Sequence, residues 1–209
     1  MKNYEALLTT LACVIPLCAC AQQAAPPPGA PTRAAQSAMV KLVDAKGASA
    51  GQAVLTAVPD GVEIVVNATG LSPGLHGFHI HANGKCEPGP DAATGQTVAF
   101  GAAGGHFDPE MTGHHGNPIT NAKPNHAGDV PNLNADTAGN ATIRFVNTKV
   151  TLVPGKTSVI GRALVVHANA DDYVSDPAGN SGGRVLCGVI EPARVDAVIG
   201  QAPATGAVR

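Results

Sequence analysis

Short apolar segments separated by turn residues limit the fold of this chain more than any other feature. No stretch of useful length carries a helical period, whereas runs rich in Val, Ile, Leu and Ala recur along the middle of the sequence. The expected strands are 39–43, 52–58, 62–67, 74–81, 141–146, 150–153, 163–167 and 185–190. Pro59-Asp60-Gly61 predicts a hairpin between the second and third strands. We therefore predict an all-β fold, a single-domain antiparallel Greek-key barrel or sandwich of about eight strands.

The ends of the chain are predicted to lie outside this domain. Residues 1–21 contain a mostly apolar run that is too short to span a bilayer and is typical of a secretory signal. The small residues at its end fit cleavage after Ala21, but they also resemble a bacterial lipoprotein signal in which Cys20 becomes the lipidated first residue, and we lean slightly to the lipoprotein. The remaining segments are a Pro/Ala-rich linker (22–37), the domain (38–191) and a C-terminal tail (192–209).

Export and composition together suggest the partners of this protein. We expect an exported, periplasmic protein that meets the membrane only through a lipid on Cys20. The formal net charge is −2 and no basic cluster is present, so nucleic acid is not an expected partner. A homodimer is compatible with the sequence.

The number and positions of the cysteines support export. Of five cysteines, three lie in the predicted signal, and only Cys86 and Cys187 remain in the domain. One pair in an exported protein favours a disulfide over the alternative of two free buried thiols. The bridge would stabilise the fold by about 4–5 kcal/mol in the chain-entropy model.

A His-x-His pair marks the predicted strand 74–81. Side chains alternate along a strand, so His79 and His81 face one side, about 7 Å apart, and can converge on one metal ion. Phe78 and Ile80 face the other side. His76 lies three positions before His79 and therefore faces away from the pair, which predicts a structural role.

The other histidines indicate that this pair belongs to a built site. Four of the eight histidines fall within residues 83–131, a stretch with almost no hydrophobic period. A loop of that length in a small domain is either disordered or functional, and we predict a long metal-binding loop. His126 and Asp129, spaced i and i+3, could bind one tetrahedral ion, and three nitrogens with a carboxylate suit zinc.

Six segments occur in order: GLHGFHIH, AAGGHFDP, TGHHGNP, NHAGD, GRALVVHANADD and GGRVLCGVI. Together they resemble the copper/zinc superoxide dismutases of the bacterial exported type. The resemblance covers residues 38–191. It implies copper and zinc cofactors and dismutation of superoxide to dioxygen and hydrogen peroxide, by alternate reduction and oxidation of a His-ligated copper beside a structural zinc.

The resemblance also implies roles for individual residues. The copper ligands would be His79, His81, His106 and His167, and the zinc ligands His106, His115, His126 and Asp129. His106 would bridge the two metals and carry a proton, and Arg184 would supply the positive charge beside the open copper position. Asp171 would hydrogen-bond one ligand of each metal, and Cys86 would pair with Cys187.

Three departures from the family pattern bear on these roles. The family's bacterial members have a Lys where His114 stands, so we prefer His115 as the ligand. The connection from His115 to His126 is longer than usual, which puts the conformation of residues 116–125 in question, and the residues that steer substrate have no clear counterpart after Asp172. The alternative to a dismutase is a non-catalytic copper/zinc-binding exported protein on the same fold.

Overall fold

The computed structural model describes residues 37–91, 94–120 and 123–193. The predicted signal, nearly all of the linker and most of the C-terminal tail lie outside these residues. No helix in the described part of the chain is long and apolar enough to cross a membrane.

Ten strands form one antiparallel sheet, and two further short strands form a second sheet. The large sheet contains β1 (Ser37–Asp44), β2 (Ser49–Val58), β3 (Gly61–Ala68), β4 (Gly74–His76), β5 (Phe78–His81), β8 (Leu133–Ala135), β9 (Ala141–Asn147), β10 (Ala163–His167), β11 (Arg184–Val189) and β12 (Glu191–Pro192). The small sheet pairs β6 (Gly89–Pro90) with β7 (Thr97–Val98), and a 3₁₀ turn, η1, follows at Gly101–Ala103.

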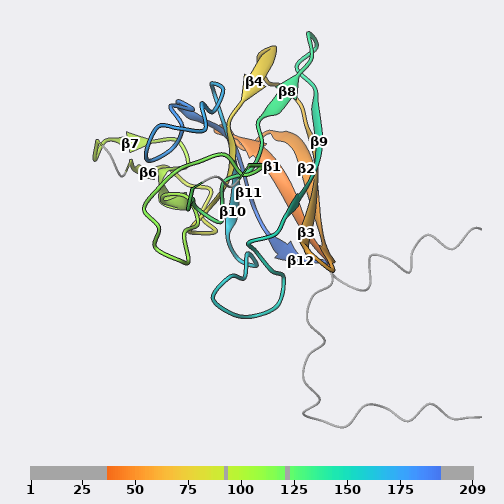
Figure 1. The fold of residues 1–209 in the computed structure, drawn as a ribbon. Coiled ribbons are helices and arrows are strands. Elements are labelled where there is room, and N and C mark those ends of the chain that lie inside the picture. The colour runs from red at the N-terminus through yellow and green to blue at the C-terminus, as the bar shows by residue number, and fades with distance from the viewer. Residues whose placement is uncertain (1–36, 92–93, 121–122, 194–209) are drawn as a thin grey trace, which may run out of the picture. The chain divides into compact units, whose positions relative to one another are not determined.

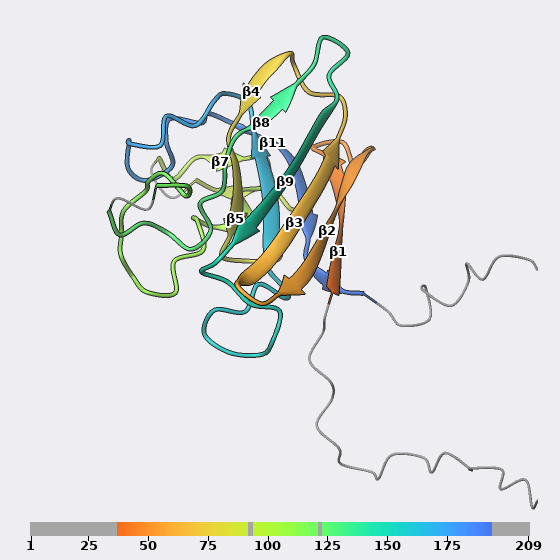
Figure 2. The same cartoon turned by 45° about the vertical axis from the view of Figure 1, so that its right-hand side comes forward.

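The large sheet curls into a nearly closed barrel (Figure 1). Its order is β4-β8-β9-β3-β2-β1-β11-β10-β5, with β12 beside β1. The first and last strands in this order, β4 and β5, are consecutive in sequence and separated by Gly77 alone. Figure 2 shows β9, β3, β2 and β1 side by side on one side of the barrel, with β5 on the other. The predicted all-β, antiparallel Greek-key fold is confirmed.

Most predicted strands match observed ones, and the hairpin at Pro59-Asp60 joins β2 to β3 as expected. The strand predicted at 150–153 is wrong, because Thr151 makes only an isolated bridge to Ser158. The chain turns back there, and the Thr151 amide donates to the Thr157 carbonyl at 3.0 Å. Val150 and Leu152 are buried, so their alternation reflects core packing without a sheet partner.

The single strand predicted at 74–81 is divided at Gly77. Its amide donates to the Asn169 carbonyl at 2.7 Å, and its carbonyl accepts from the His167 amide at 2.8 Å. A Cβ at this position would lie 2.5 Å from the Cβ of Ser181, so only glycine fits. The break lets the two halves of the predicted strand pair with different neighbours, β8 and β10.

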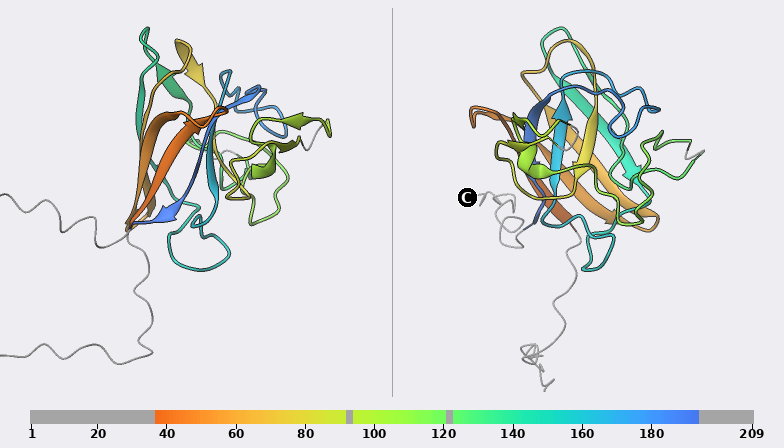
Figure 3. Two further views of the ribbon diagram at one scale, coloured as in Figure 1. Left: turned by 180° about the vertical axis from the view of Figure 1, so that it is seen from behind. Right: turned by 90° about the vertical axis from the view of Figure 1, so that its left-hand side faces the viewer.

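The core of the barrel consists of aliphatic side chains together with Phe78 and Phe107. Phe78 and Ile80 point into this core, while His79 and His81 occupy the opposite face of β5, as the alternation predicts. The segments 82–91, 94–120 and 123–132 gather with the segment 168–183 on one side of the barrel (Figure 3). The described residues of the long loop predicted at 83–131 are largely irregular, and among them only β6, β7 and η1 are regular elements.

Candidate metal centre

Four imidazoles meet on the outer face of β5 and β10. His79 and His81 come from β5, His167 ends β10, and His106 comes from the long loop; their nearest ring nitrogens all lie within 4.8 Å of one another. His79 pairs with Val165 and His81 with Ala163 in the ladder between β5 and β10. Three of the four histidines are therefore placed by a single strand pair.

Backbone carbonyls fix the orientation of two of these rings. Nδ1 of His81 lies 2.8 Å from the Gly104 carbonyl oxygen, and Nδ1 of His167 lies 3.1 Å from that of Gly182. A carbonyl oxygen can only accept, so each Nδ1 carries the hydrogen and each Nε2 presents a lone pair. The two Nε2 atoms face each other at 3.3 Å, an arrangement that suits a cation bound by both.

The other two histidines have buried ring nitrogens without a hydrogen-bond partner. Nε2 of His79 donates to Asp171 Oδ2 at 2.7 Å, and Nδ1 of His106 lies 2.9 Å from Asp129 Oδ1. Their opposite atoms, His79 Nδ1 and His106 Nε2, are the buried side-chain polar atoms left unpaired among the described residues. Buried polar groups are rarely left unpaired, so this pair of atoms fits metal ligands.

The pKa values of these four histidines also favour metal binding. Burial, followed by the neighbouring His106, lowers the pKa of His79 and of His81 well below the usual value. Burial likewise lowers the pKa of His106, and that of His167 to about 4. Neutral imidazoles are the form that binds a metal, and four nitrogen donors suit copper.

A second cluster adjoins the first through His106. Oδ1 of Asp129 lies 2.9 Å from Nδ1 of His106, 3.0 Å from that of His115 and 3.3 Å from that of His126. Burial alone would raise the pKa of the Asp129 carboxyl, but hydrogen bonds with these three histidines lower it well below its usual range. Three nitrogens and one carboxylate oxygen within 4.8 Å of one another match a tetrahedral zinc site.

Asp171 connects the two clusters. Its Oδ2 accepts from His79, and its Oδ1 accepts from Nε2 of His115 at 2.8 Å. Because Nε2 of His115 donates, a neutral His115 presents its Nδ1 lone pair to the second cluster. Gly179 makes room for this bridge, since a Cβ there would lie 1.9 Å from Asp171 Oδ1 and 2.7 Å from His115 Nε2.

His114 and His76 lie outside both clusters. The side chain of His114 is 66% exposed, and its Nδ1 lies 3.1 Å from Asp176 Oδ2. His76 is buried, with its ring nitrogens 2.7 Å from the His167 carbonyl oxygen and 2.8 Å from that of Ser72. Of the two adjacent histidines, the structure thus brings His115 to the cluster.

Arg184 begins β11 opposite His167. Its Nη1 and Nη2 each donate at 2.7 Å, to the carbonyl oxygens of Phe100 and Gly104. The Gly104 oxygen also accepts from His81, so one backbone carbonyl holds both the guanidinium and a ring of the first cluster. The sequence motifs did not single out Gly104, because its part is played by its backbone oxygen.

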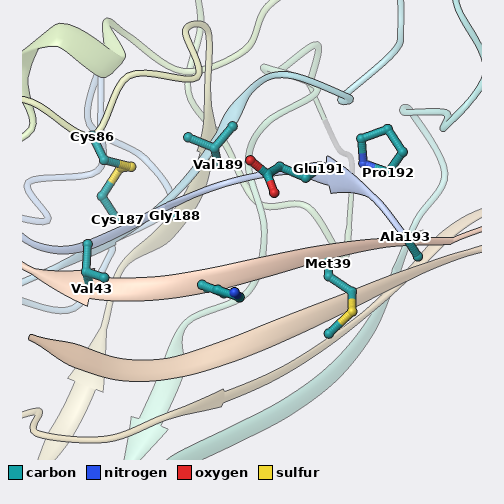
Figure 4. Close-up of a pocket in the computed structure, with 10 residues that line it drawn as sticks. Met39, Val43, Cys86, Cys187, Gly188, Val189, Glu191, Pro192 and Ala193 are labelled. Atoms are coloured by element: carbon teal, nitrogen blue, oxygen red, sulfur yellow. A yellow bond between two sulfur atoms is a disulfide. The ribbon is translucent and has the colours of Figure 1, made fainter. Parts of the chain in front are cut away.

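The disulfide between Cys86 and Cys187 is confirmed, with Cα atoms 5.6 Å apart. It ties the start of the long loop to β11, three residues after Arg184. A hollow of about 710 Å³ lies beside the disulfide, and none of the residues that line it is a histidine (Figure 4).

Comparison with known proteins settles the family. Residues 49–190 match the model of the family described as copper/zinc superoxide dismutase (SODC). The chain belongs to this family. A superoxide dismutase [Cu-Zn] of Deinococcus radiodurans is 44% identical to it over 150 residues, which span 72% of this chain and 81% of that protein.

Solved structures agree with the fold of this dismutase. The Cu/Zn superoxide dismutase from Brucella abortus is 36% identical, with a TM-score of 0.63 over 74% of this chain and 99% of that one. A SOD-like protein from Bacillus subtilis is 32% identical, with a TM-score of 0.61 over 72% of this chain and 96% of that one. Copper and zinc are thus the metals expected of this dismutase, and its two histidine clusters fit them.

Proposed function

We propose that this dismutase converts superoxide to dioxygen and hydrogen peroxide at a copper ion held by His79, His81, His106 and His167. The observation that carries the proposal is the set of buried ring nitrogens around one point. In three of these rings the opposite nitrogen donates to a carbonyl or carboxylate oxygen, and that of His106 faces Asp129. When bound, copper supplies the one-electron couple for two successive superoxide ions, and zinc, which has no redox chemistry, supplies structural order.

The second cluster is proposed as the zinc site. His106, His115, His126 and Asp129 would hold the ion, and Asp171 would hold a ligand of each site in a fixed tautomer. His106 Nε2 is the one atom of the shared ligand that faces the copper side. It is therefore the atom we assign to hold and release a proton.

Arg184 is the residue we assign to superoxide itself. Its guanidinium is fixed by two carbonyl oxygens beside His81, so a positive charge is present where a small anion would approach. Such a preorganised charge stabilises developing and bound anions without reorganisation. A protein that only stores metal needs no cation there.

The test combines metal analysis with a superoxide assay on the purified mature protein. Arg184→Ile should keep both metals, lower turnover severalfold or more, and weaken inhibition by small anions. Arg184→Lys should fall between, because the charge remains while the planar fork is lost. Absence of dismutation above free-ion background in the metal-loaded protein would favour the metal-carrier alternative, whereas an active wild type matched by Arg184→Ile would contradict the role assigned to Arg184.

Export to the periplasm, with or without a lipid on Cys20, completes the proposal. Intact mass of the mature N-terminus in a bacterial host distinguishes a lipidated Cys20 from cleavage after Ala21. A mature protein that still carries residues 1–19 would contradict both lipidation of Cys20 and cleavage after Ala21.

A homodimer is proposed through the hollow beside the disulfide. Its walls combine apolar side chains such as Met39 and Val189 with Lys41 and Glu191 (Figure 4). In a two-fold contact each charge can face the opposite charge of the second copy. Lys41→Glu should then weaken self-association in sedimentation equilibrium, and adding Glu191→Lys should restore it; a monomeric wild type would contradict the proposal.

A further inference from the structure

The chain just before His126 is tied to the barrel by a contact that the sequence motifs do not contain. Asn125 is 4% exposed. Lys149 places its ammonium against Asn125 Oδ1 and lies 3.4 Å from the Asn125 carbonyl oxygen. Lys149 lies in the turn that directly follows β9, a strand paired with β3 and β8, so it is held next to the sheet and is not part of the metal loop.

This contact fixes which way the Asn125 amide points. An ammonium can only donate, so Lys149 selects the amide oxygen and leaves Nδ2 as the donor toward the zinc cluster. Nδ2 lies 3.2 Å from Asp129 Oδ2, and the Gly116 amide donates to the same oxygen at 3.1 Å. With Oδ2 occupied by two donors, Oδ1 is the oxygen turned toward the three histidines.

Asn125 has little room to leave this position. A Cβ on Gly116 would lie 3.0 Å from the Asn125 Cβ, so the two residues are in tight contact. On the other side, Asn125, Asp129 and Lys149 are among the residues that line a cavity of only about 10 Å³. A cavity of that size is at the lower limit for a single water molecule, about 10–15 Å³.

We propose that Lys149 and Asn125 are positioning residues of the zinc site, which select Asp129 Oδ1 as the ligand atom and so set the affinity for zinc. The inference rests on the proposed zinc ligation by His106, His115, His126 and Asp129. Partners that hold a metal ligand through a hydrogen bond typically change metal affinity by about 10–100-fold when they are removed.

The experiment titrates zinc and cobalt(II) into the metal-depleted full chain, with a chelator as competitor. Lys149→Met keeps the length of the side chain and removes its charge. It should weaken zinc binding by about 10–100-fold and alter the visible absorption of cobalt(II), which reports ligand geometry. Lys149→Arg, which can still donate to Asn125, should restore most of the affinity and the spectrum.

Lys156→Met is the matched control. Lys156 pairs with Glu110 at 2.9 Å on the surface, and both side chains are more than 60% exposed. The same loss of charge there should leave zinc affinity and the cobalt(II) spectrum at wild-type values, because an exposed ion pair contributes little.

A second variant keeps the inference testable if Lys149→Met does not fold. Asn125→Asp retains a partner for Lys149 but replaces the Nδ2 donor with an oxygen facing Asp129 Oδ2, and should weaken zinc binding at least as much. Wild-type affinity and spectrum in both Asn125→Asp and Lys149→Met would overturn the inference. A wild type that binds neither zinc nor cobalt(II) would instead overturn the zinc site itself.

Discussion

The two halves of the metal centre are built from different parts of the molecule. The proposed copper half stands on β5 and β10, and backbone carbonyls orient two of its rings. The proposed zinc half lies in the loop region, and the side chain of Asp171 orients His115, while Asn125 and the Gly116 amide hold Asp129. The barrel therefore places three of the four copper ligands, with His106 supplied by the loop, whereas the zinc half depends on loop contacts and on its ion.

This difference leads us to expect different responses to the loss of each metal. Strand ladders bury their hydrogen bonds and open only with the whole fold, while loops open locally at low cost. The ion in the loop half should order its surroundings, and the ion in the strand half should find its ligands already in place.

Removal of one ligand from each half gives the largest effect. His81→Ala should lose copper and reduce dismutation to background while zinc is retained, because only the strand half is changed. His126→Ala should lose zinc and broaden the copper geometry, since His106 is shared. Metal content and the electron paramagnetic resonance of copper(II) measure both. His114→Ala is the control, and zinc loss in that variant without loss in His115→Ala would reverse the choice of ligand.

Removal of the disulfide should give the next largest effect. Cys86→Ser with Cys187→Ser should lower the free energy of unfolding by about 4–5 kcal/mol, the chain-entropy value for so long a loop. The bridge also joins the loop to the strand that carries Arg184, so we expect faster amide exchange around residues 99–106. A purely local bridge would leave that exchange and the activity unchanged.

Gly179→Ala probes the link between the halves. Its Cβ would overlap Asp171 Oδ1, so the carboxylate must move away from His115. Because Asp171 orients a ligand of each cluster, both metals should bind about 10–100-fold more weakly. Gly183→Ala is a suitable control, since a Cβ there meets no atom within 4 Å. Loss of only one metal would show that the halves are independent.

The smallest expected effect is a difference between the protonation of His115 in the zinc half and that of His167 in the copper half, in the metal-depleted protein. Burial alone would lower the pKa of His115, but hydrogen bonds with Asp129 and Asp171 raise it to about 9. In the metal-depleted protein its contribution to stability is present below about pH 6.5 and lost as pH rises through 9. Burial lowers the pKa of His167 to about 4, so its contribution is present above about pH 6.5 and lost as pH falls toward 4.

Calorimetry in buffers of different ionisation enthalpy should detect the same difference. At pH 7 zinc should displace about one proton, from His115, and copper should displace none from His167. Equal proton release for the two metals would contradict the contrast. Thermal unfolding of the metal-depleted chain across pH 5–9 provides the second measurement.

The sequence predicts the arrangement of the copper half, which stands on strands, better than that of the zinc half, which lies in the loop. Alternation within β5 is a local property, so the positions of His79, His81, Phe78 and Ile80 follow from the period of a strand. The contact of Lys149 with Asn125 joins residues far apart in sequence and depends on how the loop folds back. No local pattern encodes it.

Two differences between the predicted and observed strands also arise because a strand needs a partner that is distant in the sequence. Residues 150–153 have the alternation of a strand, yet a strand also needs a partner, and Pro154-Gly155 turns the chain before one is reached. Conversely β8 is only three residues long and was not predicted, because its existence depends on pairing with β4. Local apolar pattern indicates burial, but pairing is decided by the whole sheet.

The single residue between β4 and β5 has a consequence for the order of folding. His76 pairs with Leu133, and Phe78 pairs with Val166. The strands on the two sides of Gly77 can therefore form only after different and distant parts of the chain have reached them. Contacts between residues far apart in sequence carry a large loop-closure entropy and form slowly. The hairpins from β1 to β3 can form as soon as they are synthesised, whereas the seam at Gly77 must be among the last parts to close. His79 and His81 adjoin that seam, so a chain still in the act of folding should be unable to capture copper at this site.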